Sequence, residues 1–129
     1  MSMIMNANCP PAKDYRNWDY AVGTLIVKTF NSEYRFRVEG GAWITKITMI
    51  GSTNGRHEEC KGFYASFTDG LLTRISACMY EGVVPDFSDL WGTKLEFKFR
   101  TSENLNAPME GRDFNLITSP IRSITLTVS

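Results

Sequence analysis

The chain has few of the residues that usually identify an enzyme or a metalloprotein. It holds a single histidine, His57, and three cysteines with no Cys-x-x-Cys spacing among them. A closed zinc site is hard to assemble from so few ligands, so we expect neither a metal nor any other cofactor. The sequence also has no glycine-rich phosphate loop and no nucleophile elbow. We therefore predict a protein that is not an enzyme.

His57 is a candidate for a catalytic role. It precedes two acidic residues, Glu58 and Glu59, which could orient its ring as a general base. The nucleophile would then be Cys60 or a distant serine, and neither stands in a recognisable motif. We favour the alternative, a solvated loop histidine.

The chain also lacks an excess of charge and lacks long apolar runs. Fourteen basic residues balance fourteen acidic ones, whereas nucleic-acid binding usually needs a basic surplus. The apolar runs span only a few residues, far below the roughly twenty that cross a bilayer. We expect no nucleic-acid partner and no membrane insertion. The odd cysteine count and the missing signal peptide predict a cytoplasmic protein, or one released without a classical signal.

Alternation of apolar and polar residues with period two dominates what is present. Residues 33–39 read Glu-Tyr-Arg-Phe-Arg-Val-Glu, and the same alternation returns over 93–101 and 121–128. This pattern is typical of antiparallel strands with one face in water. At 129 residues the chain fits one domain. We predict an all-β, single antiparallel domain, either a β-prism or a β-sandwich, over residues 21–129, with residues 1–20 as an N-terminal arm or edge segment.

Other segments complete the expected fold. Further strands are predicted over residues 24–30, 43–50, 61–68, 71–80 and 114–118, with only a short helical turn over 85–90. The expected core comprises Ile26, Phe36, Ile47, Phe63, Phe67, Ile75, Leu95, Phe97, Phe99, Ile124 and Leu126. Trp91 is expected to fill the core rather than to bind a ligand, because tryptophan is highly buried on average.

Residues 61–68 and 71–80 are predicted to pair as a hairpin around Asp69-Gly70. A three-residue turn with a left-handed Gly70 would place Cys60 opposite Cys78. A two-residue turn would instead place the two cysteines on opposite faces. We favour buried free thiols over a bridge, and expect the fold to need no disulfide.

Several segments resemble the jacalin-like lectins, whose fold is a β-prism of three four-stranded sheets. The likeness rests on residues 44–50, 62–70 and 91–99, and on Gly111-Arg112-Asp113 followed by 121–124. These segments are similar to paired central strands, a later alternating strand, and a closing Gly-Arg loop with its final strand. Ser119-Pro120 stands where the family has an aspartate.

The resemblance implies a carbohydrate-binding, lectin-like module whose ligand is a glycan or glycoprotein. Gly111, Arg112 and Asp113 are the positions that match the family's sugar site. Their chemistry suits this role, because aspartate accepts hydrogen bonds from hydroxyls and arginine presents a fork of donors. The alternative is a protein-binding or assembly module without a sugar ligand, such as a viral or phage structural component or an inhibitor. Exposed edge strands would then pair in a homo-oligomer.

Overall fold

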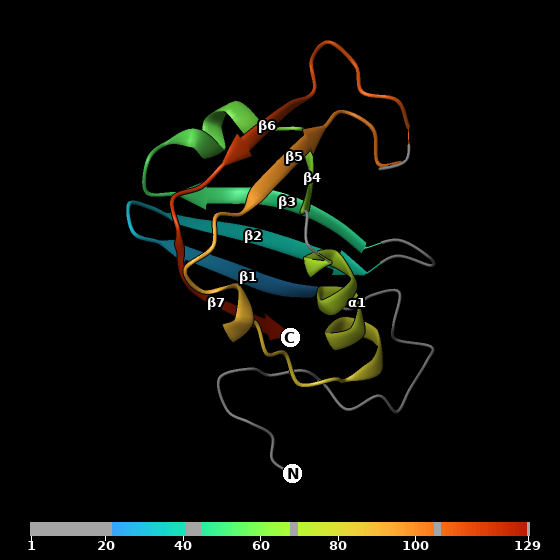
Figure 1. The fold of residues 1–129 in the computed structure, drawn as a ribbon. Helices are drawn as coiled ribbons and strands as arrows, with labels where there is room; N and C mark the ends of the chain where they lie inside the picture. Colours follow the sequence, from blue (N-terminus) through green and yellow to red (C-terminus); the bar gives the residue numbers. More distant parts are fainter. Residues whose placement is uncertain (1–21, 41–44, 68–69, 105–106, 129) are drawn as a thin grey trace.

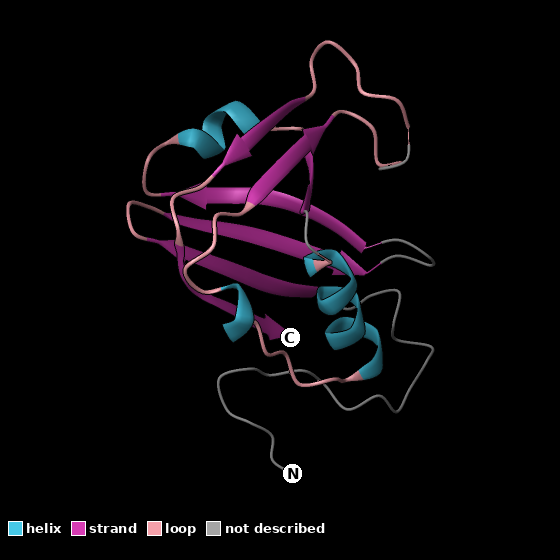
Figure 2. Ribbon diagram, in the orientation of Figure 1, coloured by secondary structure: helices cyan, strands magenta, loops and turns pink. Residues whose placement is uncertain are grey.

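The computed structural model describes residues 22–40, 45–67, 70–104 and 107–128. Within these ranges it contains seven β-strands, one α-helix and two short 3₁₀ turns (Figure 2). The expected arm over residues 1–20 lies outside the described residues. The prediction of an all-β antiparallel domain is confirmed.

The larger sheet, sheet A, has four strands in the order β3-β2-β1-β7, and every pair is antiparallel. Its strands are β1 (Val22–Thr29), β2 (Glu33–Gly40), β3 (Thr45–Ser52) and β7 (Ile121–Val128). Consecutive hairpins join the first three strands, while the last strand of the chain pairs beside β1 (Figure 1). The first and last described strands, β1 and β7, are therefore neighbours, with β1 inside the sheet and β7 at its edge.

The smaller sheet, sheet B, lies over one face of sheet A (Figure 1). Its three antiparallel strands follow the order β4-β5-β6. They are β4 (Tyr64–Phe67), β5 (Glu96–Arg100) and β6 (Phe114–Ile117). The described residues thus form two packed sheets, as in the β-sandwich alternative, and not the three sheets of a β-prism.

Aromatic rings fill the space between the two sheets. The ring of Phe97 on β5 meets the ring of Phe36 on β2 edge-on, with 5.1 Å between centroids. Phe67 lies 5.3 Å from Phe97 and 5.2 Å from Phe36, so three rings from both sheets touch one another. Edge-to-face pairs at these distances are favourable beyond the area that they bury. This cluster fixes how sheet B sits on sheet A.

The alternating segments present the predicted faces to the core. Tyr34, Phe36 and Val38 of β2 are buried while the charged residues between them face outward. Two of the expected core residues are only partly buried: Phe63, which still packs against the core, and Ile26, which does not face it. In β1 the buried positions are Leu25 and Val27, so Ile26 lies on the outer face of sheet A, between Arg35 and Thr125 on the neighbouring strands.

The predicted strand over 71–80 is wrong, because this segment forms helix α1 (Leu71–Glu81). The buried residues Leu71, Ile75, Cys78 and Met79 recur at helical spacing and face the core. Gly70 has a left-handed φ of 72°, as expected, but it begins the helix instead of closing a hairpin. The hairpin register that placed Cys60 opposite Cys78 therefore does not exist.

The two described cysteines differ in their covalent state. Cys60 is a free, buried thiol at the end of the 3₁₀ turn η2 (Arg56–Cys60). Cys78 takes part in a disulfide, so the expectation of a free thiol is wrong for Cys78 and is confirmed for Cys60. An odd cysteine count excludes a complete set of pairs but not a single bridge, and sequence spacing does not give the connectivity.

The helix packs closely against the start of β1. A Cβ atom placed on Gly23 would lie 3.2 Å from Sδ of Met79 and 3.0 Å from the carbonyl oxygen of Thr127. Only glycine leaves room here for α1 and β7 together. Among the described helices, none is long and apolar enough to span a membrane.

Candidate functional site

The three residues predicted from the lectin resemblance lie in the loop between β5 and β6. Gly111 and Arg112 are exposed in the turn just before β6, and Asp113 is half-buried. A Cβ on Gly111 would meet no atom within 4 Å, so close packing does not require glycine there.

Asp113 has a clear structural task in the same loop. One carboxylate oxygen accepts hydrogen bonds from the backbone N–H and the hydroxyl of Thr101, at 2.9 and 3.3 Å. The other oxygen accepts the backbone N–H of Glu110 at 2.9 Å. The N–H groups of Glu110 and Thr101 hold the pKa of Asp113 below its usual value, because they stabilise the charged form. Asp113 therefore ties the two ends of the loop together, which leaves its oxygens engaged.

Trp91 departs from its expected place, since its side chain is 52% exposed. It follows the 3₁₀ turn η3 (Ser88–Leu90), where Leu90 supplies the buried side chain instead. A shallow hollow of about 90 Å³ lies beside Trp91 and is bordered by Asp86, Ser88 and Thr125. Asp86 accepts hydrogen bonds from both the backbone and the hydroxyl of Ser88, which fold the turn.

A larger depression lies at the end of sheet A where β1 turns into β2. Two adjoining hollows, of about 550 Å³ and 340 Å³, share Glu33 and Thr53. We call their union the hairpin-end groove. It is lined by Lys28, Thr29, Phe30, Asn31, Ser32, Glu33, Arg35, Ile50, Gly51, Ser52, Thr53, Arg122 and Ser123.

Strand register places these residues side by side. Lys28 of β1 is the partner of Glu33 on β2 and of Ser123 on β7. Thr53 closes the row on the other side, because its N–H donates to the carbonyl of Glu33 and its hydroxyl accepts the N–H of Glu33. The groove therefore crosses all four strands of sheet A at one end.

Both edge strands of sheet A carry a one-residue bulge at this end. On β3, Met49 pairs with Phe36 and Gly51 with Arg35, so Ile50 is the extra residue. On β7, Ile121 pairs with Thr29 and Ser123 with Lys28, so Arg122 is the extra residue. Bulges turn a side chain away from its regular direction and are common beside functional sites. Here the two bulged residues, Ile50 and Arg122, line opposite ends of the groove.

Phe30 and Arg122 form the most exposed part of the groove. The guanidinium of Arg122 lies over the ring of Phe30, 5.8 Å from its centroid. The side chain of Phe30 is nevertheless 64% exposed, which is unusual for a phenylalanine. An arginine over an aromatic ring is attracted by the negative face of the ring, and this contact orients both groups.

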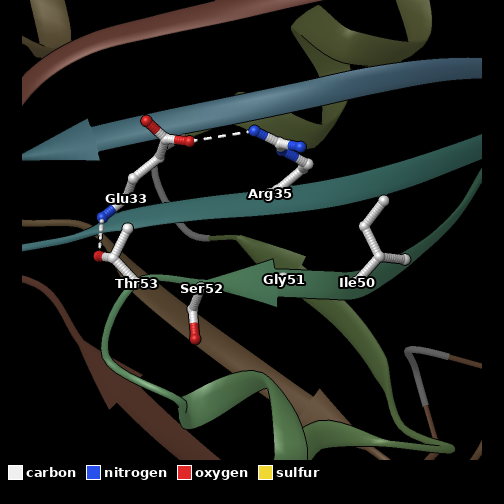
Figure 3. Close-up of a pocket in the computed structure, with 6 residues that line it drawn as sticks. All are labelled: Glu33, Arg35, Ile50, Gly51, Ser52 and Thr53. Atoms are coloured by element: carbon white, nitrogen blue, oxygen red, sulfur yellow. Dashed lines mark hydrogen bonds and ion pairs between the residues drawn. The ribbon is translucent and has the colours of Figure 1, made fainter.

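The charged groups of the groove form one partly neutralised cluster. Glu33 pairs with Arg35 at 3.3 Å and lies 3.9 Å from the ammonium of Lys28. Figure 3 shows Glu33, Arg35 and Ile50 on one side of the sheet, with the Ser52 side chain directed away from them. With Arg122, the groove holds three cations and one carboxylate.

Ser52 and His57 make the arrangement closest to a catalytic pair. Nδ1 of His57 lies 3.1 Å from the hydroxyl of Ser52 and accepts the backbone N–H of Ser52 at 3.1 Å. The Ser52 hydroxyl also accepts the backbone N–H of His57, and Nε2 lies 3.4 Å from Glu58. These bonds fold the turn between β3 and η2. Because the Ser52 hydroxyl points toward this turn and away from the groove (Figure 3), they are explained without a catalytic role.

Sequence reasoning did not single out the groove. Phe30 is the last residue of the strand predicted over 24–30, and Asn31-Ser32 follow it. The available signal was a large aromatic residue immediately before turn residues, since the tip of a hairpin has no core to receive it. The bulge that places Arg122 over Phe30 coincides with a break in the alternation, because the apolar residues Ile121 and Ile124 are three positions apart.

Comparison with family models, curated proteins and solved structures found no match for this chain.

Proposed function

We propose that this protein is a non-enzymatic carbohydrate-binding module and that the hairpin-end groove is its saccharide site. The observation that carries the proposal is the exposed ring of Phe30 at the mouth of a polar groove. Saccharides offer an apolar ring face together with many hydroxyl groups. A site for them therefore needs an aromatic surface beside hydrogen-bonding groups.

The lining residues supply this combination. Phe30 presents its ring, while Asn31, Glu33 and Ser123 offer amide, carboxylate and hydroxyl groups on either side. Gly51 has only the Cβ of Arg35 near its missing side chain, at 3.9 Å, so a ligand can approach the backbone there. A hollow of about 550 Å³ has room for a saccharide of more than one ring.

The hairpin that carries Phe30 is held in place before any ligand arrives. Thr29 and Ser32 close the turn through a backbone bond of 2.8 Å and two further bonds that involve the Thr29 hydroxyl. The N–H of Phe30 donates to the carbonyl of Pro120 at 3.1 Å, which attaches the tip to the turn before β7. A preorganised platform loses less conformational entropy on binding, and this favours affinity.

The proposal keeps the functional class that the lectin resemblance implies, but places the site elsewhere. It needs neither a β-prism nor the loop of Gly111, Arg112 and Asp113. Phe30 and Arg112, which mark the two locations, are 82 residues apart in sequence, so substitutions separate the two sites cleanly.

Screening on a glycan array, followed by calorimetry with the best ligand, tests the proposal. Phe30→Ala should weaken binding by at least about tenfold, or about 1.4 kcal/mol. Trp91→Ala is the matched control, because Trp91 is also an exposed aromatic residue but lies outside the groove. If Trp91→Ala removes binding and Phe30→Ala does not, the hollow beside Trp91 is the site. If no saccharide binds the folded parent, the proposal fails.

A role as a protein-binding or assembly module is the second candidate, and one observation favours it. Ile117 on β6 is a large apolar side chain in an edge strand of sheet B, and it is exposed. Exposed edge strands are templates for pairing with another chain. Sedimentation of the parent and of Ile117→Lys tests this role. A multimer that the substitution dissociates would favour assembly, and a monomeric parent would count against it.

A further inference from the structure

We infer that the saccharide taken by the hairpin-end groove is an anionic one, carrying a carboxylate or a sulfate ester. This inference rests on the proposed function and adds the chemical class of the ligand. Lys28, Arg35 and Arg122 contribute three positive charges to the lining, and Glu33 contributes one negative charge. The whole chain is neutral, with 14 basic and 14 acidic residues, so the surplus is local to the groove.

The ion pairs of the cluster leave this surplus in place. Glu33 is the carboxylate partner of both Lys28 and Arg35, so one negative charge serves two cations. Arg122 lies over Phe30, and an aromatic ring attracts a guanidinium without neutralising its charge. Two positive charges therefore stay uncompensated within the lining.

The outer face of the same sheet shows a different pattern further along. Arg37, two residues beyond Arg35 on β2, pairs with Glu39 at 3.3 Å. Neither residue of that pair lines the groove. Cations and carboxylates thus balance along β2 outside the groove, while cations outnumber carboxylates inside it.

The geometry suits an anion that is attached to a sugar ring. Arg122 is placed by the β7 bulge over one face of the Phe30 ring, so a saccharide that contacts the exposed remainder of this ring has a guanidinium close by. Guanidinium groups bind carboxylates and sulfates through paired N–H donors, which favours them over a neutral hydroxyl. Thr29, Ser32 and Thr53 already use their side-chain oxygens within the protein. Arg122 pairs with no carboxylate of the lining, so its guanidinium can donate to a ligand beside Asn31 and Ser123.

A matched pair of ligands tests the inference. Sialyllactose and lactose share a disaccharide, and only the first carries a carboxylated sugar. Calorimetry should show that sialyllactose binds the parent at least about tenfold more tightly than lactose. This preference should shrink as sodium chloride is raised from low to high concentration, because exposed charges are screened. A sulfated lactose in place of sialyllactose shows which of the two anions the site prefers.

Substitutions assign the preference to the groove. Arg122→Gln and Arg35→Gln should each reduce the ratio between sialyllactose and lactose, whereas Arg37→Gln, on the same strand but outside the groove, should leave it unchanged. Equal affinity of the parent for sialyllactose, sulfated lactose and lactose would overturn the inference while leaving the proposed function intact. An anion preference that survives both groove substitutions would also overturn it. If no saccharide of any charge binds, the proposed function falls as well.

Discussion

The rings of Phe36 and Phe97 meet edge-on across the domain, with 5.1 Å between their centroids. Phe36 belongs to sheet A and Phe97 to sheet B, so this pair joins the two halves of the sandwich. Tyr34, on the same strand as Phe36, makes a second edge-on contact with Phe97, with 5.3 Å between the ring centroids.

Replacement of Phe97 with alanine should lower the free energy of unfolding by about 3 to 5 kcal/mol, because it leaves a large cavity at the junction of the sheets. Urea denaturation measures this value. Phe30→Ala is the control, since Phe30 is exposed and its loss should change the stability by less than about 0.5 kcal/mol. A Phe97→Ala variant as stable as the parent would show that this ring does not hold the sheets together.

Gly23 should tolerate no larger side chain, although valine ordinarily favours strands. Valine at this position would press on the Thr127 carbonyl and on Met79 of α1, and such overpacking costs about 1 to 3 kcal/mol. Gly51→Val is the matched control, because only the Cβ of Arg35 lies near that site, at 3.9 Å. Thermal unfolding of both variants measures the difference. Equal melting temperatures would mean that α1 is not packed against β1 as described.

Asp113 should make stability depend on pH in the acid range. Its pKa is lowered in the folded protein by the N–H groups of Glu110 and Thr101, so the unfolded chain binds the proton more readily. The stabilisation is present above the ordinary aspartate pKa of about 3.9 and is lost as the pH falls through the lowered value. Asp113→Asn should therefore flatten the curve of unfolding free energy against pH below about pH 4. A curve parallel to that of the parent would contradict the role of Asp113 in closing the loop.

Cys60 should react slowly in the native protein. Burial raises the pKa of its thiol to about 11, and its side chain is only 2% exposed. At pH 8 only about one thiol in a thousand would be the reactive thiolate. Peptide mass spectrometry after iodoacetamide treatment should find Cys60 modified in urea and almost unmodified in buffer. Comparable labelling rates in the two conditions would place Cys60 at the surface.

The strands could be predicted from the sequence wherever one face meets water. Residues 33–39 and 124–128 indicate their core faces through strict alternation, and the structure has strands over both segments. Ile26 was misplaced because β1 has apolar residues on both sides, so alternation did not select between Leu25 and Ile26. Helix α1 was missed because Asp69-Gly70 suggested a hairpin turn, and this outweighed the helical spacing of Leu71, Ile75 and Met79.

The groove could not be predicted in the same way. It depends on two bulges, which add Ile50 and Arg122 to the edges of sheet A at the same end. A bulge follows from how two strands pair, so a break in alternation such as that between Ile121 and Ile124 does not show which residues the bulge brings together. Lys28 and Glu33 could be recognised as neighbours of a turn, but their proximity to Ser123 needed the pairing of β1 with β7.

The most direct test of the saccharide site is a nuclear magnetic resonance titration of the isotope-labelled protein with sialyllactose. Backbone amide shifts should change at residues 28–35, 50–53 and 119–123, which surround the groove, and the changes should saturate. Shifts confined to the loop of Gly111, Arg112 and Asp113, or to the surroundings of Trp91, would contradict the placement of the site. A folded protein whose spectrum stays unchanged with sialyllactose and with every saccharide found on the array would contradict carbohydrate binding itself.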